Sequence, residues 1–334
     1  FVSEEVAKVN IKTEVNGQNA KLVTEIKDAD GNVVATESTD KLFGNQMEQN
    51  IGVPHPKIWD LEEPNLYFAT MKLYQGNELK DEQTIRFGIR TVEYERGKGL
   101  VLNGKVTKFK GVCLHHDLGP LGAAVNRAAL KRQLTILKDM GINSIRSAHN
   151  MPSIEQVELC DEMGILMLAE SFDEWAKPKV KNGYNRWFNE WAEKDVINLV
   201  RATRNHPSVV MWSAGNEVPD QWGNEGVKRA KWLQDIFHRE DPTRPVTVGM
   251  DQVANTMKNG FGAIFDIPGL NYRLPLYDEA YDVFPQGFIL GSETASTVSS
   301  RGIYKFPVEE YKQKTYDDFQ SSSTDKVNAG KNSQ

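Results

Sequence analysis

The chain has 334 residues, of which 39% are hydrophobic and 26% charged, and its formal net charge is −6 at pH 7. This composition is typical of a globular protein long enough for two domains. The negative charge argues against nucleic acid as a main partner, and no apolar run reaches the roughly 18 residues that a membrane span needs. The first residues lack the basic and apolar regions of a signal peptide, so we expect a soluble protein and leave cytoplasm and periplasm open.

Residues 1–92 have the pattern of an all-β domain. Residues 21–26 and 32–35 are strand-like and flank a turn at 28–31, and apolar side chains alternate with others over 67–73. Short strands separated by Gly, Asn and Asp turns, with no helical period, predict an immunoglobulin-like β-sandwich.

Residues 93–319 show a different pattern, in which strands alternate with helices. Leu130, Leu134, Leu137 and Met140 recur at helical spacing, and Gly141 is placed to end that helix. Repeated strand–helix units predict a parallel sheet. Seven strands are expected, at 108–115, 143–148, 165–170, 208–215, 246–250, 264–271 and 287–292.

Polar residues follow these strands all along the series, which favours a (β/α)8 TIM-type barrel over a doubly wound sheet. An eighth strand is not visible, so the barrel is expected to be incomplete. Residues 320–334 have a disordered composition. Cys113 and Cys160 lie in apolar patterns, which favours two buried free thiols over a disulfide.

Two glutamates end buried-strand patterns in the barrel region. Glu217 closes the segment 212–217 and Glu293 closes the segment 288–293. Parallel strands deliver such residues to one face of a barrel. Two carboxylates facing one cleft are the usual machinery of glycoside hydrolysis, and two solvated loop glutamates are the alternative.

The motifs, taken in order, resemble those of family 2 glycoside hydrolases, the family of β-galactosidases, β-glucuronidases and β-mannosidases. The resemblance rests on residues 58–67, 87–90, 102–105, 110–117, 146–152, 204–208, 215–217, 271–272 and 291–293. It implies a further sugar-binding sandwich before residue 1 and an eighth barrel strand, neither of which is seen. We therefore expect a fragment whose turnover as it stands is weak.

The resemblance also assigns roles around the two glutamates. It implies that Glu217 is the acid/base and Glu293 the nucleophile of a retaining mechanism, whereas the residues alone identify only the pair. Asn216 would bind the sugar 2-hydroxyl. Arg146 would favour the ionised nucleophile or serve as a structural ion-pair partner, and His149 would bind sugar hydroxyls.

Tyr272 resembles the family tyrosine that donates a hydrogen bond to the nucleophile, with a rim aromatic as the alternative. His115 and Asp117 are expected to bind sugar hydroxyls. His116 adjoins His115 on an extended segment, so the two rings point apart and do not suggest a shared metal ion.

Asp173 and Trp175 follow the third strand and are further candidates for substrate binding. The roles of Trp175 and of the nearby Trp187, Trp191 and Trp222 stay divided between sugar stacking and ordinary packing. Some family members hold magnesium beside the acid/base through a carboxylate, but Lys194 stands at that position. We predict no metal and no cofactor.

The function predicted from these patterns is a retaining exo-β-glycosidase, with β-D-galactosides favoured as substrates. A β-glucuronidase or β-mannosidase of the same family and a non-catalytic sugar-binding remnant are the alternatives. The expected partner is a carbohydrate substrate, without nucleic acid or membrane, and the choice between monomer and homo-oligomer is open.

Overall fold

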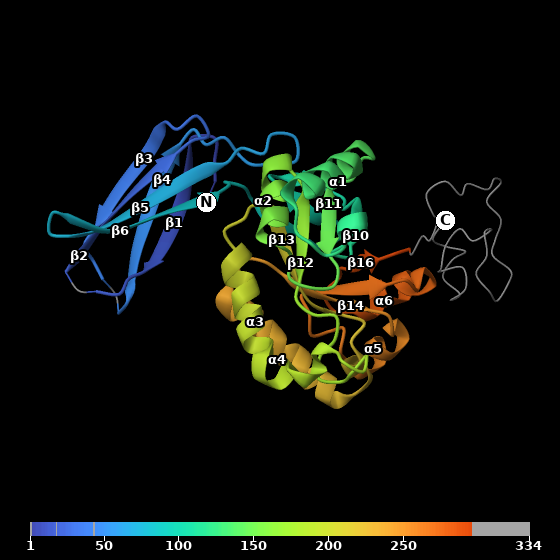
Figure 1. Cartoon of the computed structure of the whole chain (residues 1–334). Coiled ribbons are helices and arrows are strands. Elements are labelled where there is room, and N and C mark those ends of the chain that lie inside the picture. The colour runs from blue at the N-terminus through green and yellow to red at the C-terminus, as the bar shows by residue number, and fades with distance from the viewer. Residues whose placement is uncertain (1, 18, 43, 296–334) are drawn as a thin grey trace.

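The N-terminal part of the chain is a β-sandwich (Figure 1). A computed structural model describes residues 2–17, 19–42 and 44–295. Two strands pair antiparallel in one sheet, and four form the other in the order β3-β2-β5-β6. The strands are β1 (Val6–Glu14), β4 (Gln46–Pro54), β2 (Ala20–Lys27), β3 (Val33–Thr39), β5 (Tyr67–Gln75) and β6 (Glu78–Phe87). The sandwich predicted from the sequence is therefore confirmed.

Alternate residues of β4 point into the sandwich. Met47, Ile51 and Val53 are almost completely buried, while their neighbours along the strand are exposed. Because side chains alternate across a strand, this pattern directs one face of β4 toward the other sheet. The sandwich core forms from Ile51 and Val53 together with Ile26 and Tyr67 of the facing sheet.

A small three-stranded sheet connects the sandwich to the barrel. It consists of β7 (Val92–Glu95), β8 (Gly99–Leu102) and β9 (Lys105–Val106), paired antiparallel. The Tyr94 hydroxyl donates to the carbonyl of Val210 at 3.0 Å, in the fourth barrel strand. Trp59, fully buried between β4 and β5, donates through its indole N–H to the carbonyl of Asp161 at 2.8 Å. These contacts fix the sandwich against the barrel.

Seven parallel strands form the sheet of the barrel in chain order. They are β10 (Gly111–Leu114), β11 (Ser144–Ser147), β12 (Leu166–Glu170), β13 (Val209–Asn216), β14 (Val246–Met250), β15 (Ile267–Asn271) and β16 (Leu290–Glu293). The parallel barrel and its seven strands are confirmed. The sixth strand begins later than expected, because Phe265 is buried in the core between sheet and helices, where an apolar residue has the same sequence pattern as a strand residue.

Six α-helices accompany these strands in the described part of the barrel. They are α1 (Arg127–Asp139), α2 (Ile154–Met163), α3 (Phe188–Thr203), α4 (Asn224–Glu240), α5 (Val253–Asn259) and α6 (Tyr277–Val283). Asn126 and Ser153 cap the first two by accepting backbone N–H groups with their side chains. Gly164 ends α2 at φ 63°, where a side chain would also collide with the carbonyl of Leu61.

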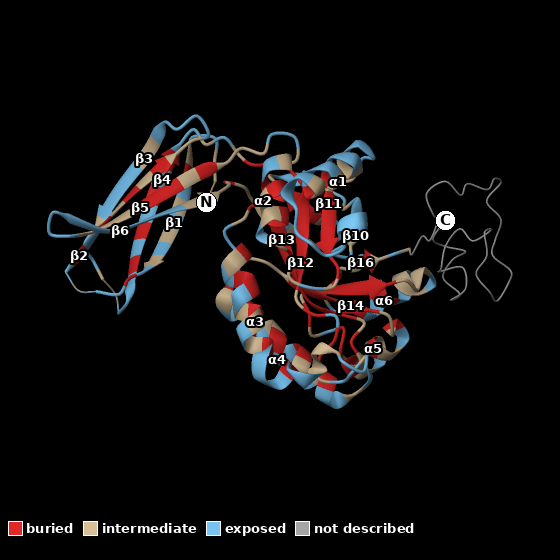
Figure 2. Cartoon of the chain, viewed as in Figure 1, coloured by how far each residue is buried: buried red, intermediate tan, exposed pale blue. Residues whose placement is uncertain are grey.

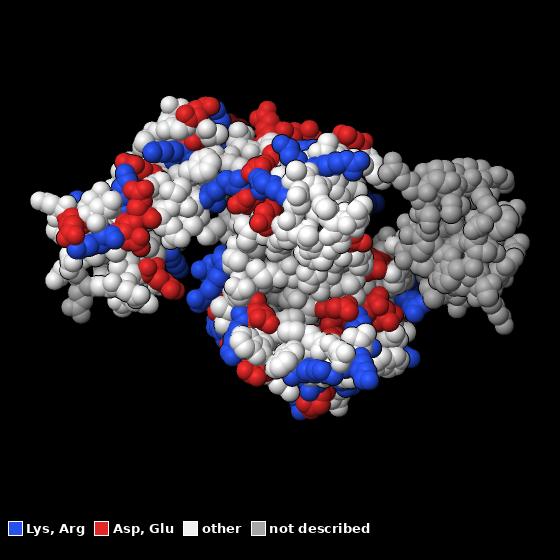
Figure 3. All heavy atoms as spheres, viewed as in Figure 1, with Lys and Arg blue, Asp and Glu red and all other residues white. Residues whose placement is uncertain are grey.

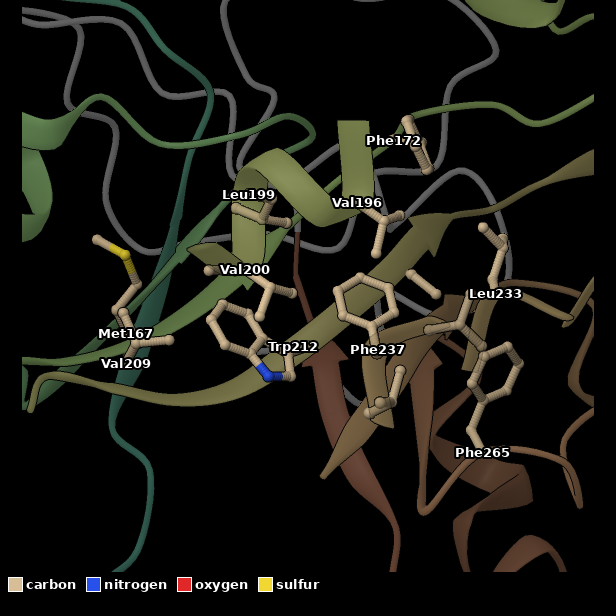
Figure 4. Packing of buried hydrophobic residues seen from close by; sticks show 14 of the residues in the cluster. Met167, Phe172, Val196, Leu199, Val200, Val209, Trp212, Leu233, Phe237 and Phe265 are labelled. Atoms are coloured by element: carbon tan, nitrogen blue, oxygen red, sulfur yellow. The ribbon is translucent and has the colours of Figure 1, made fainter. Parts of the chain in front are cut away.

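The main core lies between the strands and the helices. Figure 2 shows the inner barrel strands buried along their length and the helices buried on one side only; β11 to β15 are buried throughout, whereas β10 and β16 are partly exposed. In Figure 4, Leu199 and Val200 of α3 and Phe237 of α4 lie around Trp212 of β13. All four side chains are at most 1% exposed. Burying this apolar surface is the main stabilising contribution to the barrel.

The surface carries charges of both signs. On the face shown in Figure 3, lysines and arginines are interspersed with acidic residues. None of the helices in the described ranges is long and apolar enough to cross a bilayer. The predicted tail at 320–334 lies outside the described residues.

The first and last barrel strands approach each other without forming a ladder in the described part of the sheet. The thiol of Cys113 in β10 donates to the carbonyl of Ser292 in β16 at 3.4 Å. A cavity of about 660 Å³ lies beside this contact and is lined by both strands. We call this region the β10–β16 seam. Cys113 and Cys160 are both free thiols, and only Cys160 is fully buried.

Candidate active site

Polar side chains from five strands meet at the C-terminal ends of the barrel strands. Because the strands are parallel, their carboxyl ends open on one face, where the loops build a site. The side chains that hydrogen-bond to one another there come from the strands or from the residue directly after them. They are Arg146 of β11, Glu170 of β12, Asn216 of β13 and the following Glu217, Asn271 of β15 and the following Tyr272, and Glu293 of β16. The structure thus connects Glu217 and Glu293 through a continuous network.

Glu293 is held at both of its oxygens. The Tyr272 hydroxyl donates to Oε1, and Arg146 Nη1 donates to Oε2 at 3.1 Å. His149 Nε2 lies 3.9 Å from Oε2. A guanidinium and a phenol that donate to the two oxygens of one carboxylate fix its rotamer.

Glu217 has a different environment. Asn271 Nδ2 donates to its Oε1 at 3.0 Å, and its own backbone N–H donates to the carbonyl of Gly249 at 2.7 Å. Burial raises the pKa of Glu217, and the negative charges of Asp251 and Glu293 raise it further. Its backbone has φ 44°, a left-handed conformation that turns the chain away from β13. A raised pKa is the property that a carboxyl group needs to act as a general acid.

Glu170 is a completely buried carboxylate at the centre of the network. It accepts hydrogen bonds from Arg146 Nε at 2.9 Å and Nη2 at 2.7 Å, and from the Ser213 hydroxyl at 2.6 Å. Burial alone would raise the pKa of Glu170, but Arg146 and His149 hold it below its usual range. The ionised carboxylate only accepts, so His149 donates to it through Nδ1 at 2.7 Å and keeps Nε2 on the side of Glu293.

Asn216 is buried between Arg146, which holds Glu293, and Asn271, which holds Glu217. Its Oδ1 accepts from Arg146 and from Asn271, each at 2.8 Å, and its Nδ2 donates to Asp173 at 3.0 Å. Burial would raise the pKa of Asp173, but hydrogen bonds from Lys179 and Asn216 lower it overall. The amide orientation is therefore fixed before any sugar binds, and one N–H of Nδ2 is left for a further acceptor.

Trp175, for which both sugar stacking and ordinary packing were open, is packed inside the barrel. Its side chain is fully buried, and its indole N–H donates to the carbonyl of Ala214 at 2.8 Å. A side chain added at Gly215 would meet the indole nitrogen at 2.7 Å, so the ring lies directly beneath the Gly215–Asn216 backbone. Trp175 supports the end of β13 and offers no face to a ligand.

The remaining predicted residues lie nearer the rim. The His115 ring packs edge-on against His149 at 4.8 Å between centroids, and burial lowers its pKa, with His149 adding to that shift. Asp117 is exposed and accepts a hydrogen bond from the backbone of Gly119 at 2.7 Å. No hydrogen bond or ion pair among the described residues joins Asp117 to the network. Trp187, Trp191 and Trp222 are all exposed.

Sequence reasoning missed three members of the site. Glu170 and Asn271 each end a fully buried strand, and Gly249 of β14 lies where the side chains of Asn271, Arg146 and Asn216 converge. A Cβ at Gly249 would approach Asn271 Oδ1 to 2.8 Å, Arg146 Nη2 to 2.9 Å and Asn216 Oδ1 to 3.1 Å. For Glu170 and Asn271 the signal available in advance was a polar residue ending an otherwise apolar strand, the same criterion that selected Glu217 and Glu293, whereas Gly249 carried no such signal.

Within the described residues, no group of three or more His, Cys, Asp or Glu side chains could hold a metal ion. Lys194 lies over the ring of Trp191, with Nζ 4.2 Å from the centroid. Its ammonium group is a cation and offers no ligand to a metal.

A parallel barrel with a half-buried carboxyl pair at its C-terminal face, preceded by a β-sandwich, is typical of a glycoside hydrolase. The model "Glycosyl hydrolases family 2, TIM barrel domain" matches residues 92–320, and the model "Glycosyl hydrolases family 2" matches residues 2–90. The chain belongs to glycosyl hydrolase family 2.

Relatives of the chain carry two activity names. It is 36% identical over 346 residues to the β-galactosidase BoGH2A of Bacteroides ovatus, covering 92% of this chain and 41% of that protein. It is 40% identical over 243 residues to a putative β-glucuronidase of Formosa agariphila, covering 72% of this chain and 23% of that protein. The chain therefore spans less than half the length of either relative.

The solved structures include a family 2 member from Bacteroides cellulosilyticus. It superimposes with a TM-score of 0.83 at 32% identity, and the match covers 89% of this chain and 39% of that one.

Proposed function

We propose that the chain carries the catalytic site of a retaining exo-β-glycosidase, with Glu293 as the nucleophile and Glu217 as the acid/base. One contrast supports this assignment. Glu293 accepts from Arg146 and Tyr272, whereas burial and nearby carboxylates raise the pKa of Glu217. A carboxylate held by a donor at each oxygen, together with a second carboxyl group whose pKa is raised, is the pattern of a nucleophile and acid pair.

In the first step, Glu293 Oε attacks the anomeric carbon and forms a glycosyl ester. The bond from that carbon to the leaving oxygen breaks, and Glu217 gives its proton to this oxygen. Arg146 and Tyr272 each hold one oxygen of Glu293, which keeps the carboxylate aligned for attack. The leaving group departs as a neutral alcohol.

In the second step, the ionised Glu217 takes a proton from water, and the water oxygen bonds to the anomeric carbon. The ester bond to Glu293 breaks, and its carboxylate returns to Arg146 and Tyr272. The proton on Glu217 restores the starting state, so the net reaction is hydrolysis with retained configuration.

The sugar ring would lie over the network, with its 2-hydroxyl at Asn216 and further hydroxyls at His149, His115 and Asp173. Arg146 lies beneath this surface, since it is 4% exposed and its donors are directed at Glu170, Asn216 and Glu293. We assign it to orienting the nucleophile. The role of Asp117 stays a prediction from the family resemblance.

We favour β-D-galactosides as substrates, as the relative matched over 92% of this chain is named a β-galactosidase. The test is hydrolysis of nitrophenyl β-galactoside, β-glucuronide and β-mannoside by residues 1–334. The rate is measured as the release of nitrophenol. We expect the galactoside to be preferred by at least about tenfold in kcat/KM, since a buried polar site rejects a mismatched substituent strongly. Release no faster than in buffer for all three would favour a non-catalytic sugar-binding remnant.

A β-glucuronidase is the second candidate. The relative with 40% identity is named a putative β-glucuronidase. Preference for the glucuronide in the same panel would replace the galactoside assignment and leave the roles of Glu217 and Glu293 unchanged.

A further inference from the structure

A lysine from the loop after β12 reaches the backbone that leads into Glu217. Lys179 Nζ donates to Asp173 Oδ1 at 2.8 Å, to the Asp173 carbonyl at 3.0 Å and to the Asn216 carbonyl at 3.0 Å. The Asn216 carbonyl belongs to the peptide group that joins Asn216 to Glu217. The reaction steps described above give Lys179 no role.

The peptide between Asn216 and Glu217 is held from both sides. Its N–H donates to the carbonyl of Gly249 at 2.7 Å, and its carbonyl accepts from Lys179. At this peptide the chain leaves β13 and enters the left-handed conformation of Glu217, at φ 44°. A residue with a side chain adopts that conformation only where its surroundings hold it there. The two bonds therefore fix the direction in which the Glu217 side chain leaves the backbone.

A buried carboxylate holds the backbone of Lys179 in place. Glu174 is 3% exposed, and its Oε2 accepts from the N–H of Lys179 at 2.6 Å, while its Oε1 accepts from the N–H of Asn185 at 2.8 Å. A Cβ at Gly183 would lie 1.7 Å from Glu174 Oε1, so the loop closes tightly around the carboxylate. The Lys179 side chain thus starts from a fixed point, and it is only 21% exposed.

Lys179 also holds the side chain of Asn216. Asn216 Nδ2 donates to Asp173 Oδ1 at 3.0 Å, and the same oxygen accepts from Lys179. Hydrogen bonds between charged groups are shorter and stronger than neutral ones. One ammonium group therefore holds the main chain of Asn216 directly and its amide through Asp173.

The charge of Lys179 opposes the charges of the acidic groups around Glu217. Burial raises the pKa of Glu217, and Asp251 after β14 and Glu293 of β16 add to the rise. The hydrogen bond from Asn271 and the charge of Lys179 act in the opposite direction. A group that gives a proton in one step and takes one in the next needs a pKa suited to both. The ammonium group contributes to this balance, because it favours the ionised form.

We propose that Lys179 is a positioning residue, which fixes the Asn216–Glu217 peptide and brings a positive charge to the acid/base side of the cleft. This inference rests on the proposed function, because it takes Glu217 as the acid and base. Lys179 transfers no proton and acts on the reaction through Asn216 and Glu217. Its loss should therefore change the rate and the ionisation of Glu217 together.

The kinetic test follows kcat/KM for an aryl β-galactoside against pH. Lys179→Met keeps the apolar stem of the side chain and removes its charge. It should lower kcat/KM by about tenfold at the optimum, since small displacements of reacting groups have large effects. The basic limb of the profile reports the loss of the Glu217 proton. Removing a cation raises the pKa of Glu217, so this limb should move to higher pH.

Two further variants separate charge from structure. Lys179→Arg keeps the charge and should retain the basic limb of the wild type. Lys181→Met is the matched control, because Lys181 is an exposed lysine of the same loop, and it should change neither the rate nor the limb. A Lys179→Met chain that loses activity with an unmoved basic limb would overturn the proposal, and so would one with a normal rate.

A direct titration separates this inference from the proposed function. The side-chain carboxyl carbons of glutamate are labelled with carbon-13 and followed by NMR, and the Glu217 signal is identified by its absence from the Glu217→Gln chain. We expect its titration midpoint to be higher in Lys179→Met than in the wild type and in Lys181→Met. Equal midpoints would refute the inference even if the chain hydrolyses glycosides. A higher midpoint in a chain without turnover would retain the action of Lys179 on Glu217 and refute the hydrolase proposal.

Discussion

Arg146 and Glu170 form a buried, two-point ion pair next to Glu293. Nε and Nη2 of Arg146 donate to Glu170 Oε2 at 2.9 and 2.7 Å, and its remaining nitrogen, Nη1, reaches Glu293 at 3.1 Å. The guanidinium is planar, so fixing two of its nitrogens fixes the direction of the third. Glu170 therefore positions the charge that acts on Glu293 without contacting the sugar itself.

Replacing Glu170 by Gln should lower both stability and activity. Removing one partner of a buried pair costs about 3–5 kcal/mol, and Arg146 would lose its orientation toward Glu293. The measurements are the melting temperature and kcat/KM on an aryl β-galactoside at a temperature where the variant is folded. Asp161→Asn is the control, because Asp161 is equally buried and binds Ser208 and His206 at the opposite end of the barrel. Asp161→Asn should lower the melting temperature and leave kcat/KM unchanged. Normal kcat/KM in folded Glu170→Gln would contradict the positioning role.

Glu217→Gln should make the chain more stable than the wild type at high pH. Burial raises the pKa of Glu217 above its ordinary value of 4.5. Stability from the protonated carboxyl is complete below that value and is lost as the pH rises through the folded-state pKa. Gln is neutral throughout, so the variant should melt above the wild type at about pH 8 and converge with it near about pH 4. Glu225→Gln, an exposed control paired with Lys228, should show no such gain. A difference independent of pH would argue against the raised pKa.

The two glutamates should respond differently to the leaving group. Glu217→Gln should spare a dinitrophenyl galactoside far more than an alkyl galactoside, because a good leaving group needs little protonation. Glu293→Gln should abolish turnover of both, since an amide cannot form the glycosyl ester. Intact-mass analysis with a 2-fluoro galactosyl donor should add one glycosyl unit to the wild type and none to Glu293→Gln. Equal losses on both substrates for Glu217→Gln would reverse the assignment.

A methyl group at Gly249 should damage the site more than the fold. The added Cβ would lie within about 3 Å of Asn271, Arg146 and Asn216, and such overpacking costs about 1–3 kcal/mol. We expect Gly249→Ala to lose most of its kcat while still unfolding cooperatively. Gly52→Ala in β4 is the control, since its nearest neighbour would be 3.5 Å away in ordinary contact. A fully active Gly249→Ala chain would show that the network tolerates displacement.

Much of the architecture could be predicted from periodicity. The change from alternating apolar and polar residues to repeated strand–helix units located the sandwich and the seven parallel strands. Glu217 and Glu293 were selected because each is a polar residue at the end of an apolar strand. That rule depends only on the geometry of parallel strands, so it holds without knowledge of contacts. It would also have selected Glu170 and Asn271 had it been applied to every strand.

The remaining errors concern where side chains point. Trp175 follows a strand end, as a sugar-stacking residue would, yet it turns inward beneath Gly215. A glycine such as Gly249 carries no chemical signal, and its importance depends on three side chains from other strands reaching the same place. Such convergence depends on the register between strands, which one sequence does not specify.

Glu293, the proposed nucleophile, lies on a strand that has one paired neighbour in the described part of the sheet. Among the described strands, β16 has a ladder only with β15, whereas β13 is flanked by β12 and β14. Amides of β16 should therefore exchange with solvent deuterium through small local openings, at lower free energy than those of β13. Such an opening would carry Glu293 away from Tyr272 and Arg146. On heating, catalysis would then be lost before the barrel melts. The temperature at which activity is lost would depend on the β10–β16 seam and not on the stability of the core.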